Sequence, residues 1–435
     1  MPDATLIGPR PLVQAGVQPM LTPSASTKNQ TSEDLSPASH RASKSRQAAV
    51  RARILSSPYN TDSHTILGVR SASCESIVSC QCGLSASAPP MTSGSILVAL
   101  TAFSVAVVAT GLMHRYALQR NLIDVPNLRS SHELPTPRGG GVAIVFAFFV
   151  ATILLTSLGL IDLRLFGSLL VGGGVIALVG FLDDRSHLRA SMRFGVHLAA
   201  AICVVVLLGG FSEGALANWG LHGLWVGRLI AVLVLVWMTN LFNFMDGLDG
   251  IAGSEAVFVS GAGAWLNWRG GGAPGLTAAM ASLAATCLGF LRWNWPPARI
   301  FMGDVGSGFL GFSLGILGLA ASQKGILPIE IWAILGGVFL VDATVTLVRR
   351  LMRGDRWFEA HRTHAYQVMA RRMGRHKPVT LMVVVINVFW LFPWAYAADR
   401  LQSNARLYMI AALLPLVILS IIVGAGKREE VVRGE

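Results

Sequence analysis

Three clusters of carboxylate and amide side chains stand where long apolar segments of the chain end. They comprise Asp183 and Asp184, then Asn240, Asn243, Asp246 and Asp249, and finally Asp304. A charged side chain at the centre of a bilayer costs roughly 2.5 to 3.5 kcal/mol on insertion scales, so carboxylates beside apolar segments need a reason. Carboxylate and amide oxygens are hard ligands of the kind that Mg²⁺ prefers. The clusters therefore indicate a site for a metal ion and for sugar hydroxyls.

Each cluster also has a plainer structural interpretation. Asp183 and Asp184 can repel each other so that one serves as a base, or they can mark a solvated helix end. In NLFNFMDGLDG, Asn243 and Asp246 share a helix face. A polar helix terminus and a glycine turn explain the glycines there, but not four oxygen-bearing side chains. Asp304, in RIFMGDVGSG, can cap a helix, or its glycine neighbours can let a diphosphate and a metal approach the backbone.

Two basic stretches supply donors for phosphate oxygens. The first, SSHELPTPRGGG, places Arg138 ahead of an apolar segment. The second, FEAHRTHAYQ, lies in the loop 349–378 and contains His361, Arg362 and His364. Arginine and histidine suit phosphate oxygens, and arginine can bind them bidentately. A charge-rich loop without a ligand is the alternative, and Asp342 and Asn387 receive no role.

The elements that must position these residues are apolar segments long enough to cross a bilayer. Of the 435 residues, 53% are apolar and only 13% are charged, against about 25% charged residues in soluble domains. Each segment can span a hydrocarbon core of about 30 Å at a rise of about 1.5 Å per residue. We expect eleven helices, at 95–113, 140–160, 165–182, 194–210, 227–244, 248–266, 275–291, 305–321, 326–348, 379–397 and 407–426. The sequence predicts an all-α, polytopic membrane protein.

The loops between these segments predict the orientation of the chain. When the loop after the first helix is placed in the cytoplasm, 21 Lys and Arg residues fall on that side and 6 on the other, as the concentration of positive charge in cytoplasmic loops requires. The first helix then begins outside and the C-terminus is cytoplasmic. All the acidic and basic clusters lie on the cytoplasmic side. The net charge of +12 arises mostly in these loops, so no nucleic-acid partner is expected.

Residues 1–90 differ in composition from the rest of the chain. They hold 16 Ser and 9 of the 19 Pro, but only one aromatic residue, Tyr59. Such a segment cannot bury enough apolar surface to offset its ordering entropy, so we expect it to be disordered. It has no apolar core like that of a signal peptide, although the predicted topology would place it outside. We expect residues 1–90 to be a mis-assigned translation start or a dispensable extension, with Met91 as the true start and 91–435 as the membrane domain.

Taken together, these motifs resemble those of the polyprenyl-phosphate N-acetylhexosamine-1-phosphate transferase superfamily, from 91 to about 426. The resemblance implies that Asp183 and Asp184 are the catalytic pair that handles the lipid phosphate. It implies that Asp304, with Asn243, binds the metal. Residues implied to bind the nucleotide sugar and its phosphates are Asn240, Asp246, Asp249, Arg138, His361, Arg362 and His364.

The resemblance implies transfer of N-acetylhexosamine 1-phosphate from a UDP-sugar to undecaprenyl phosphate, with release of UMP. Mg²⁺ is the implied cofactor, with Mn²⁺ as the alternative ion. The enzyme would lie in a bacterial inner membrane, with its site on the cytoplasmic face, and a homodimer is one assembly to test. HRTH, in place of three consecutive histidines, argues against a MurNAc-pentapeptide substrate. It favours the branch that starts O-antigen or other surface polysaccharides.

Two other classes of membrane protein, and two routes of phosphoryl transfer, are alternatives. A transporter would also place carboxylates among many helices. Its carboxylates should lie near the membrane midplane, and its sequence should often show an internal repeat. An intramembrane aspartyl protease would use two aspartates and leave the Asn, His and Arg clusters without a role. The sequence leaves open whether transfer is direct or passes through an aspartyl-phosphate. It does not identify the sugar.

Overall fold

The computed structural model describes residues 92–126, 134–186, 188–217, 219–355 and 361–427. The predicted leader and Met91 lie outside the described residues. The α-helices are α2 (Ser93–Gln119), α3 (Gly141–Ser157), α4 (Leu163–Gly167), α5 (Gly173–Ser186), α6 (Ala190–Leu208), α7 (Glu213–Ala217), α8 (Leu224–Met245), α9 (Ile251–Arg269), α10 (Pro274–Asn294), α11 (Asp304–Gln323), α12 (Ile329–Leu335), α13 (Gly337–Met352), α14 (Ala365–Met373), α15 (His376–Ile386), α16 (Phe392–Arg400) and α17 (Ala405–Val423).

The prediction of an all-α membrane protein is confirmed. Within the described residues, eight helical spans are long and apolar enough to cross a membrane, and the pair α12 and α13 makes nine. The other two predicted segments correspond to α3, an apolar helix of 17 residues, and to α9, a helix of 19 residues. Two spans contain a π-helical turn, η1 (Ser168–Gly172) before α5 and η2 (Asn387–Leu391) between α15 and α16. A short 3₁₀ turn, η3 (Gln402–Asn404), precedes α17.

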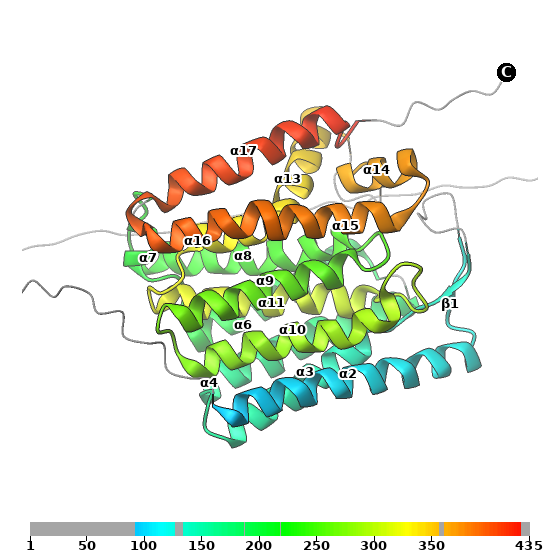
Figure 1. Ribbon diagram of the computed structural model, residues 1–435, viewed down its shortest axis with the longest axis horizontal. Helices are drawn as coiled ribbons and strands as arrows, with labels where there is room; N and C mark the ends of the chain where they lie inside the picture. The colour runs from blue at the N-terminus through cyan, green and yellow to red at the C-terminus, as the bar shows by residue number, and fades with distance from the viewer. Residues whose placement is uncertain (1–91, 127–133, 187, 218, 356–360, 428–435) are drawn as a thin grey trace, which may run out of the picture. The chain divides into compact units, whose positions relative to one another are not determined.

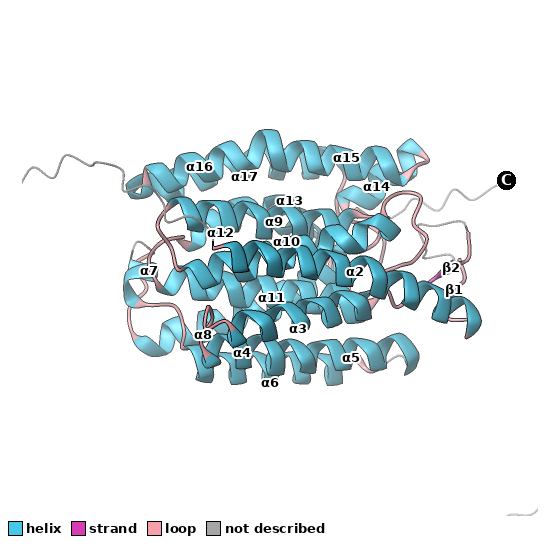
Figure 2. Cartoon of the chain, turned by 60° about the horizontal axis from the view of Figure 1, so that its bottom comes forward, coloured by secondary structure: helices cyan, strands magenta, loops and turns pink. Residues whose placement is uncertain are grey.

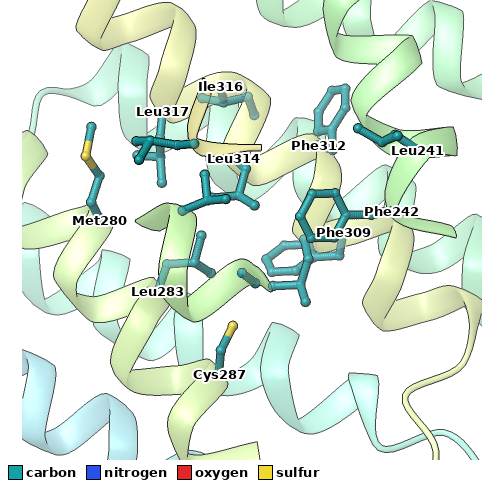
Figure 3. Packing of buried hydrophobic residues seen from close by; sticks show 14 of the residues in the cluster. Leu241, Phe242, Met280, Leu283, Cys287, Phe309, Phe312, Leu314, Ile316 and Leu317 are labelled. Carbon is teal, nitrogen blue, oxygen red and sulfur yellow. The ribbon is translucent and has the colours of Figure 1, made fainter. Parts of the chain in front are cut away.

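Helix α11 is the centre of the bundle. Its apolar segment is entirely buried, because α8 and α5 pack on it along most of its length and α3, α9 and α10 complete its surroundings. Helix α10 packs between α2 and α9, and Figures 1 and 2 show these helices running nearly alongside one another. The core contains large side chains from α8, α10 and α11, among them Phe242, Leu283, Phe309 and Phe312 (Figure 3). This close packing fixes where α8, α5 and α11 end relative to each other.

The predicted ninth segment, 326–348, differs from a straight helix. It is broken between α12 and α13, which meet at an angle of 83°. Gly336 and Gly337 stand at the break, and paired glycines lack the side-chain contacts that keep a helix continuous. The periodicity of apolar residues continues through the break, so the sequence pattern predicts a single span.

A small two-stranded ribbon is the exception to the helical fold. Strands β1 (Ile123–Asp124) and β2 (Thr136–Pro137) pair antiparallel between α2 and α3. In Figure 1, β1 and α14 lie at one end of the helices, whereas α4 and α7 lie at the other. The polar clusters of the sequence lie at the end with β1 and α14.

The polar residue Asn387, which the sequence leaves without a role, lies inside the bundle. Its amide donates a hydrogen bond of 2.6 Å to the carboxyl group of Glu255. Both side chains are fully buried. The pair joins α9 to η2.

Candidate functional site

A cavity of about 460 Å³ opens at the end of the bundle where α5 and α8 end and α11 begins. Most of the residues predicted for the site line it: Arg138, Asp183, Asp184, Asn243, Asp246, Asp249 and Asp304. They come from four stretches of the sequence that lie between Arg138 and Asp304. The packing of α5, α8 and α11 brings them together.

Two loops are joined by backbone hydrogen bonds to form one wall of the cavity. Arg138 forms a parallel bridge with Phe301. The Phe301 N–H donates to the carbonyl of Pro137 (2.8 Å), and the Gly140 N–H donates to the carbonyl of Phe301 (2.9 Å). These bonds place Arg138 beside the segment that leads into Asp304.

Helix α5 approaches the start of α11 very closely at Gly180. A Cβ atom there would lie 2.5 Å from the carbonyl oxygen of Asp304, closer than real Cβ contacts allow. Only glycine therefore permits this approach without a shift of one helix. The approach sets the separation between the aspartate pair of α5 and Asp304.

Asp184 is fixed by partners on two elements. Its carboxylate accepts a hydrogen bond from Arg138 (2.7 Å) and from the backbone N–H groups of Asp304 (3.2 Å) and Val305 (3.3 Å). The last two are among the N–H groups at the start of α11, which have no partner within the helix. Asp184 thus caps α11 from a neighbouring helix while it pairs with Arg138.

Asp183 is held by Arg193, a residue for which the sequence predicted no site role. The guanidinium of Arg193 forms an ion pair with Asp183 and lies 3.4 Å from the carboxylate of Asp304. The backbone N–H of Leu188 also donates to Asp183 (2.6 Å). Each member of the aspartate pair is therefore paired with a different arginine, and Arg193 is shared with Asp304.

Asp246 has no such compensation. Among the described residues, none donates a hydrogen bond or forms an ion pair with its carboxylate. Burial, and then the negative charges of Asp304, Asp184 and Asp249, raise the pKa of Asp246 well above its usual range. A group of carboxylates that destabilise one another in this way would be stabilised by a bound cation.

The oxygen-bearing side chains of the cavity fit a magnesium ion whose coordination is completed by the substrate. No three His, Cys, Asp or Glu side chains form a ready-made metal site in the parts of the chain that the structure describes. Mg²⁺ is usually held by one or two carboxylates and by substrate phosphates. Asp304, Asp246 and Asn243 all line the cavity. Asn243 donates its amide N–H to the Ser307 hydroxyl (3.3 Å), which leaves its carbonyl oxygen as the atom able to ligate.

Two of the predicted substrate-binding residues on and after α8 have structural partners. Asp249 accepts a hydrogen bond from the backbone N–H of Ala298 (3.0 Å) and lies 3.1 Å from His376. It therefore joins the loop before α11 to the start of α15. Asn240 donates to the carbonyl of Val236 within its own helix (2.7 Å) and lines a smaller pocket next to the main cavity.

The histidine motif lies behind the wall of the cavity. His361, Arg362 and His364 are not among the residues that line it. His364 is buried and stacks on Phe244 and on His361. The contacts of these three residues with phosphate oxygens remain predictions.

Six residues with polar side chains line the cavity without having been predicted as site residues: Asp124, Arg193, Asn294, Ser307, Gln367 and His376. Arg193 lies in the first turn of α6, shortly after the aspartate pair in the sequence, and Gln367 closes the motif HRTHAYQ. Closeness to these motifs is the signal that could have found both. Asp124 and His376 carry no comparable sequence signal.

The fold and the site together define an integral membrane protein with an acidic cavity at one end of its helices. The model of Glycosyl transferase family 4 matches residues 166–322. The chain is 31% identical over 318 residues to the probable undecaprenyl-phosphate N-acetylglucosaminyl 1-phosphate transferase of Bacillus subtilis, with 72% of this chain and 86% of the relative covered.

Two further relatives have related names. The decaprenyl-phosphate N-acetylglucosaminephosphotransferase of Mycobacterium leprae is 29% identical over 341 residues, with 71% of this chain and 84% of the relative covered. The phospho-N-acetylmuramoyl-pentapeptide-transferase of Moorella thermoacetica is 31% identical over 258 residues, with 56% and 74% covered. The chain belongs to the polyprenyl-phosphate hexosamine-1-phosphate transferase family.

Proposed function

We propose that the protein transfers N-acetylhexosamine 1-phosphate from a UDP-sugar to undecaprenyl phosphate and releases UMP. The observation that carries this proposal is the cavity itself, where the aspartate pair, Asp246, Asp304 and two arginines meet at the mouth of a membrane bundle. The family relationship supports the same reaction class, because the named relatives are polyprenyl-phosphate sugar-phosphate transferases.

The reaction needs charge compensation and alignment more than a strong base. An oxygen of the lipid phosphate attacks the β-phosphorus of the UDP-sugar, the bond from that phosphorus to the bridging oxygen breaks, and UMP leaves. Asp183, which pairs with Arg193, would remove or hold off the proton of the lipid phosphate. Arg138, which pairs with Asp184 on the cavity wall, would bind phosphate oxygens.

Other oxygen-bearing side chains of the cavity would hold the metal. Asp304, Asp246 and the carbonyl of Asn243 are its proposed ligands. When bound, Mg²⁺ would neutralise the diphosphate and the charge that develops on UMP. The cavity lies where α5 and α8 end and α11 begins, and this position at one end of the helices favours an enzyme over a transporter, whose site should lie near the midplane.

The proposed location is the cytoplasmic face of a bacterial inner membrane. The UDP-sugar is soluble, the lipid phosphate lies in the headgroup layer, and the basic loops support a cytoplasmic location of the cavity end. The product would begin an O-antigen or another surface polysaccharide. UDP-N-acetylglucosamine is the first donor to test, because two relatives are named for that sugar.

The test is release of UMP by the purified full-length protein. The assay contains undecaprenyl phosphate, MgCl₂ or MnCl₂, and a panel of UDP-N-acetylhexosamines. We expect release that requires both lipid and metal and that is lost in Asp304→Asn and Asp183→Asn. Trapping a phosphorylated protein after denaturation would indicate the two-step route. Folded protein that releases no UMP with any donor would contradict the proposal.

A further inference from the structure

Helix α14 is capped by a residue from another part of the bundle. The Asp342 carboxylate on α13 accepts hydrogen bonds from the backbone N–H groups of Ala365 (2.8 Å) and Tyr366 (3.0 Å), and from the Thr346 hydroxyl (3.1 Å). Asp342 is 5% exposed. A buried carboxylate next to apolar helices is costly unless it is well bonded. Here its bonds fix the first turn of α14 to the broken span.

The first turn of α14 rests on the segment that carries Asp246. The Tyr366 hydroxyl donates to the carbonyl of Phe244 (3.0 Å), in the last turn of α8. Gly247 lies directly against this turn, because a Cβ atom there would collide with the Tyr366 hydroxyl and would lie 3.0 Å from Nε2 of Gln367. The position of α14 is therefore coupled to the wall of the catalytic cavity.

Gln367 is the residue of α14 that reaches the cavity. It is 8% exposed and lines the cavity together with Asp246, Gly247 and Asn294. Its Oε1 accepts a hydrogen bond from the backbone N–H of His364 (3.3 Å). Because a backbone N–H needs an oxygen acceptor, this bond fixes the orientation of the amide. The NH₂ group is left on the side of Gly247.

We propose that Gln367 is a substrate-recognition residue whose amide NH₂ donates a hydrogen bond to an uncharged carbonyl oxygen of the nucleotide sugar, and that Asp342 positions it through α14. The proposal rests on the proposed function. The neighbouring Asp246 and Asp249 make this wall acidic, so a neutral acceptor suits it better than a phosphate oxygen. The carbonyl can belong to the pyrimidine base or to the N-acetyl group, and the test separates the two.

A purely structural role for Gln367 is the competing explanation. Glutamine at the third position of a helix commonly bonds back to the N-cap N–H, and glutamate serves equally well there. Gln367→Glu keeps the acceptor for His364 and removes the donor that faces the cavity. The variant therefore separates capping from recognition. Gln119→Glu, at the exposed end of α2, is a matched control that adds the same charge.

The experiment measures binding of UDP, UDP-glucose and UDP-N-acetylglucosamine to the purified full-length protein by isothermal titration calorimetry. Loss of one uncharged hydrogen bond should weaken binding about 3- to 10-fold in Gln367→Ala. Gln367→Glu should weaken it at least as much, with an unchanged melting temperature. Equal weakening for all three ligands assigns the base carbonyl. Weakening confined to UDP-N-acetylglucosamine assigns the acyl carbonyl.

The positioning role of Asp342 is tested by a double-mutant cycle. Asp342→Asn should weaken binding of the same ligand, and Asp342→Asn combined with Gln367→Ala should be no weaker than Gln367→Ala alone. A merely structural loss would instead add to the effect of Gln367→Ala. In steady-state assays the loss should appear in KM and leave kcat nearly unchanged.

Three results would overturn the inference. Gln367→Glu that binds all three ligands as Gln119→Glu does would show that Gln367 only caps α14. Additive losses in the cycle would remove the positioning role of Asp342. Wild-type protein that binds none of the ligands would contradict the proposed function and the inference together. The first two results contradict the inference alone, because they require that the wild-type protein binds.

Discussion

The two acidic sides of the cavity are stabilised in different ways. On α5, Asp183 and Asp184 are adjacent, yet each has its own arginine and accepts backbone hydrogen bonds. After α8, Asp246 has no cationic partner among the described residues and is half-buried near other carboxylates. The carboxylates without a compensating cation thus lie around Asp246 and not at the aspartate pair. A metal should bind on the side of Asp246, and the lipid phosphate should meet the arginines.

The largest effect is expected on the uncompensated side. Asp246→Asn removes a proposed metal ligand, so we expect UMP release to fall about 100- to 1000-fold, as when a preorganised charge-stabilising group is lost. Chelation by EDTA should abolish release, and excess Mg²⁺ should partly restore the variant. Glu213→Gln, in the exposed first turn of α7, should behave like wild type. Full activity of Asp246→Asn at low Mg²⁺ would place the metal elsewhere.

A smaller effect is expected when the compensated side loses its cation. Arg193→Gln leaves Asp183 without its ion pair, and such losses typically amount to about 1.5 to 3 kcal/mol, or roughly 10- to 100-fold in rate. The rate of UMP release at saturating substrates measures it. Arg189→Gln, an exposed position four residues earlier, serves as the control. Equal rates for the two variants would mean that Asp183 does not depend on Arg193.

A change in the distance between α5 and the start of α11 should lower the rate of UMP release by a smaller, but measurable, factor. Gly180→Ala must push α5 away from the carbonyl of Asp304, and we expect about a 10-fold loss of activity, as misplacement of a reacting group produces. Gly174→Ala in the same helix adds a methyl group with an ordinary contact of 3.7 Å to Phe149. If both alanine variants keep wild-type rates, the close approach at Gly180 is not needed for the reaction.

The smallest effect concerns stability, outside the cavity. Burial, together with His364 and the Arg350 guanidinium, outweighs the nearby Asp342 and lowers the pKa of His361 from 6.5 to about 3. Between these values the unfolded chain binds a proton that the folded protein does not, so His361 makes the protein less stable as pH falls below 6.5.

His361→Gln should remove this contribution, with a gain of about 2 °C or less in the melting temperature at pH 5 and none at pH 8. The exposed His222→Gln is the control. A gain of the same size at pH 8 would mean that the effect does not come from protonation of His361.

The elements of the fold could be predicted from the sequence because each apolar run is long and each polar loop is distinct. The helix break at Gly336 could not, since apolar periodicity passes through it. Asp183, Asp246 and Asp304 were placed in one site by their motifs, and the structure brings them to one cavity. The role of Arg193 depends on which way its helix turns after a short loop. The burial of His364 depends on packing against Phe244. The spacing of residues in the sequence predicts neither the role of Arg193 nor the burial of His364.

The backbone bonds that join Pro137, Gly140 and Gly141 to Phe301 and Met302 also bear on how the protein can change over evolution or by design. These bonds use main-chain atoms alone, so they tolerate changes of side chain but not of loop length. One inserted residue in either segment would shift the register and turn Arg138 away from Asp184. A chimera that exchanges one of these loops for that of a relative must exchange the other with it.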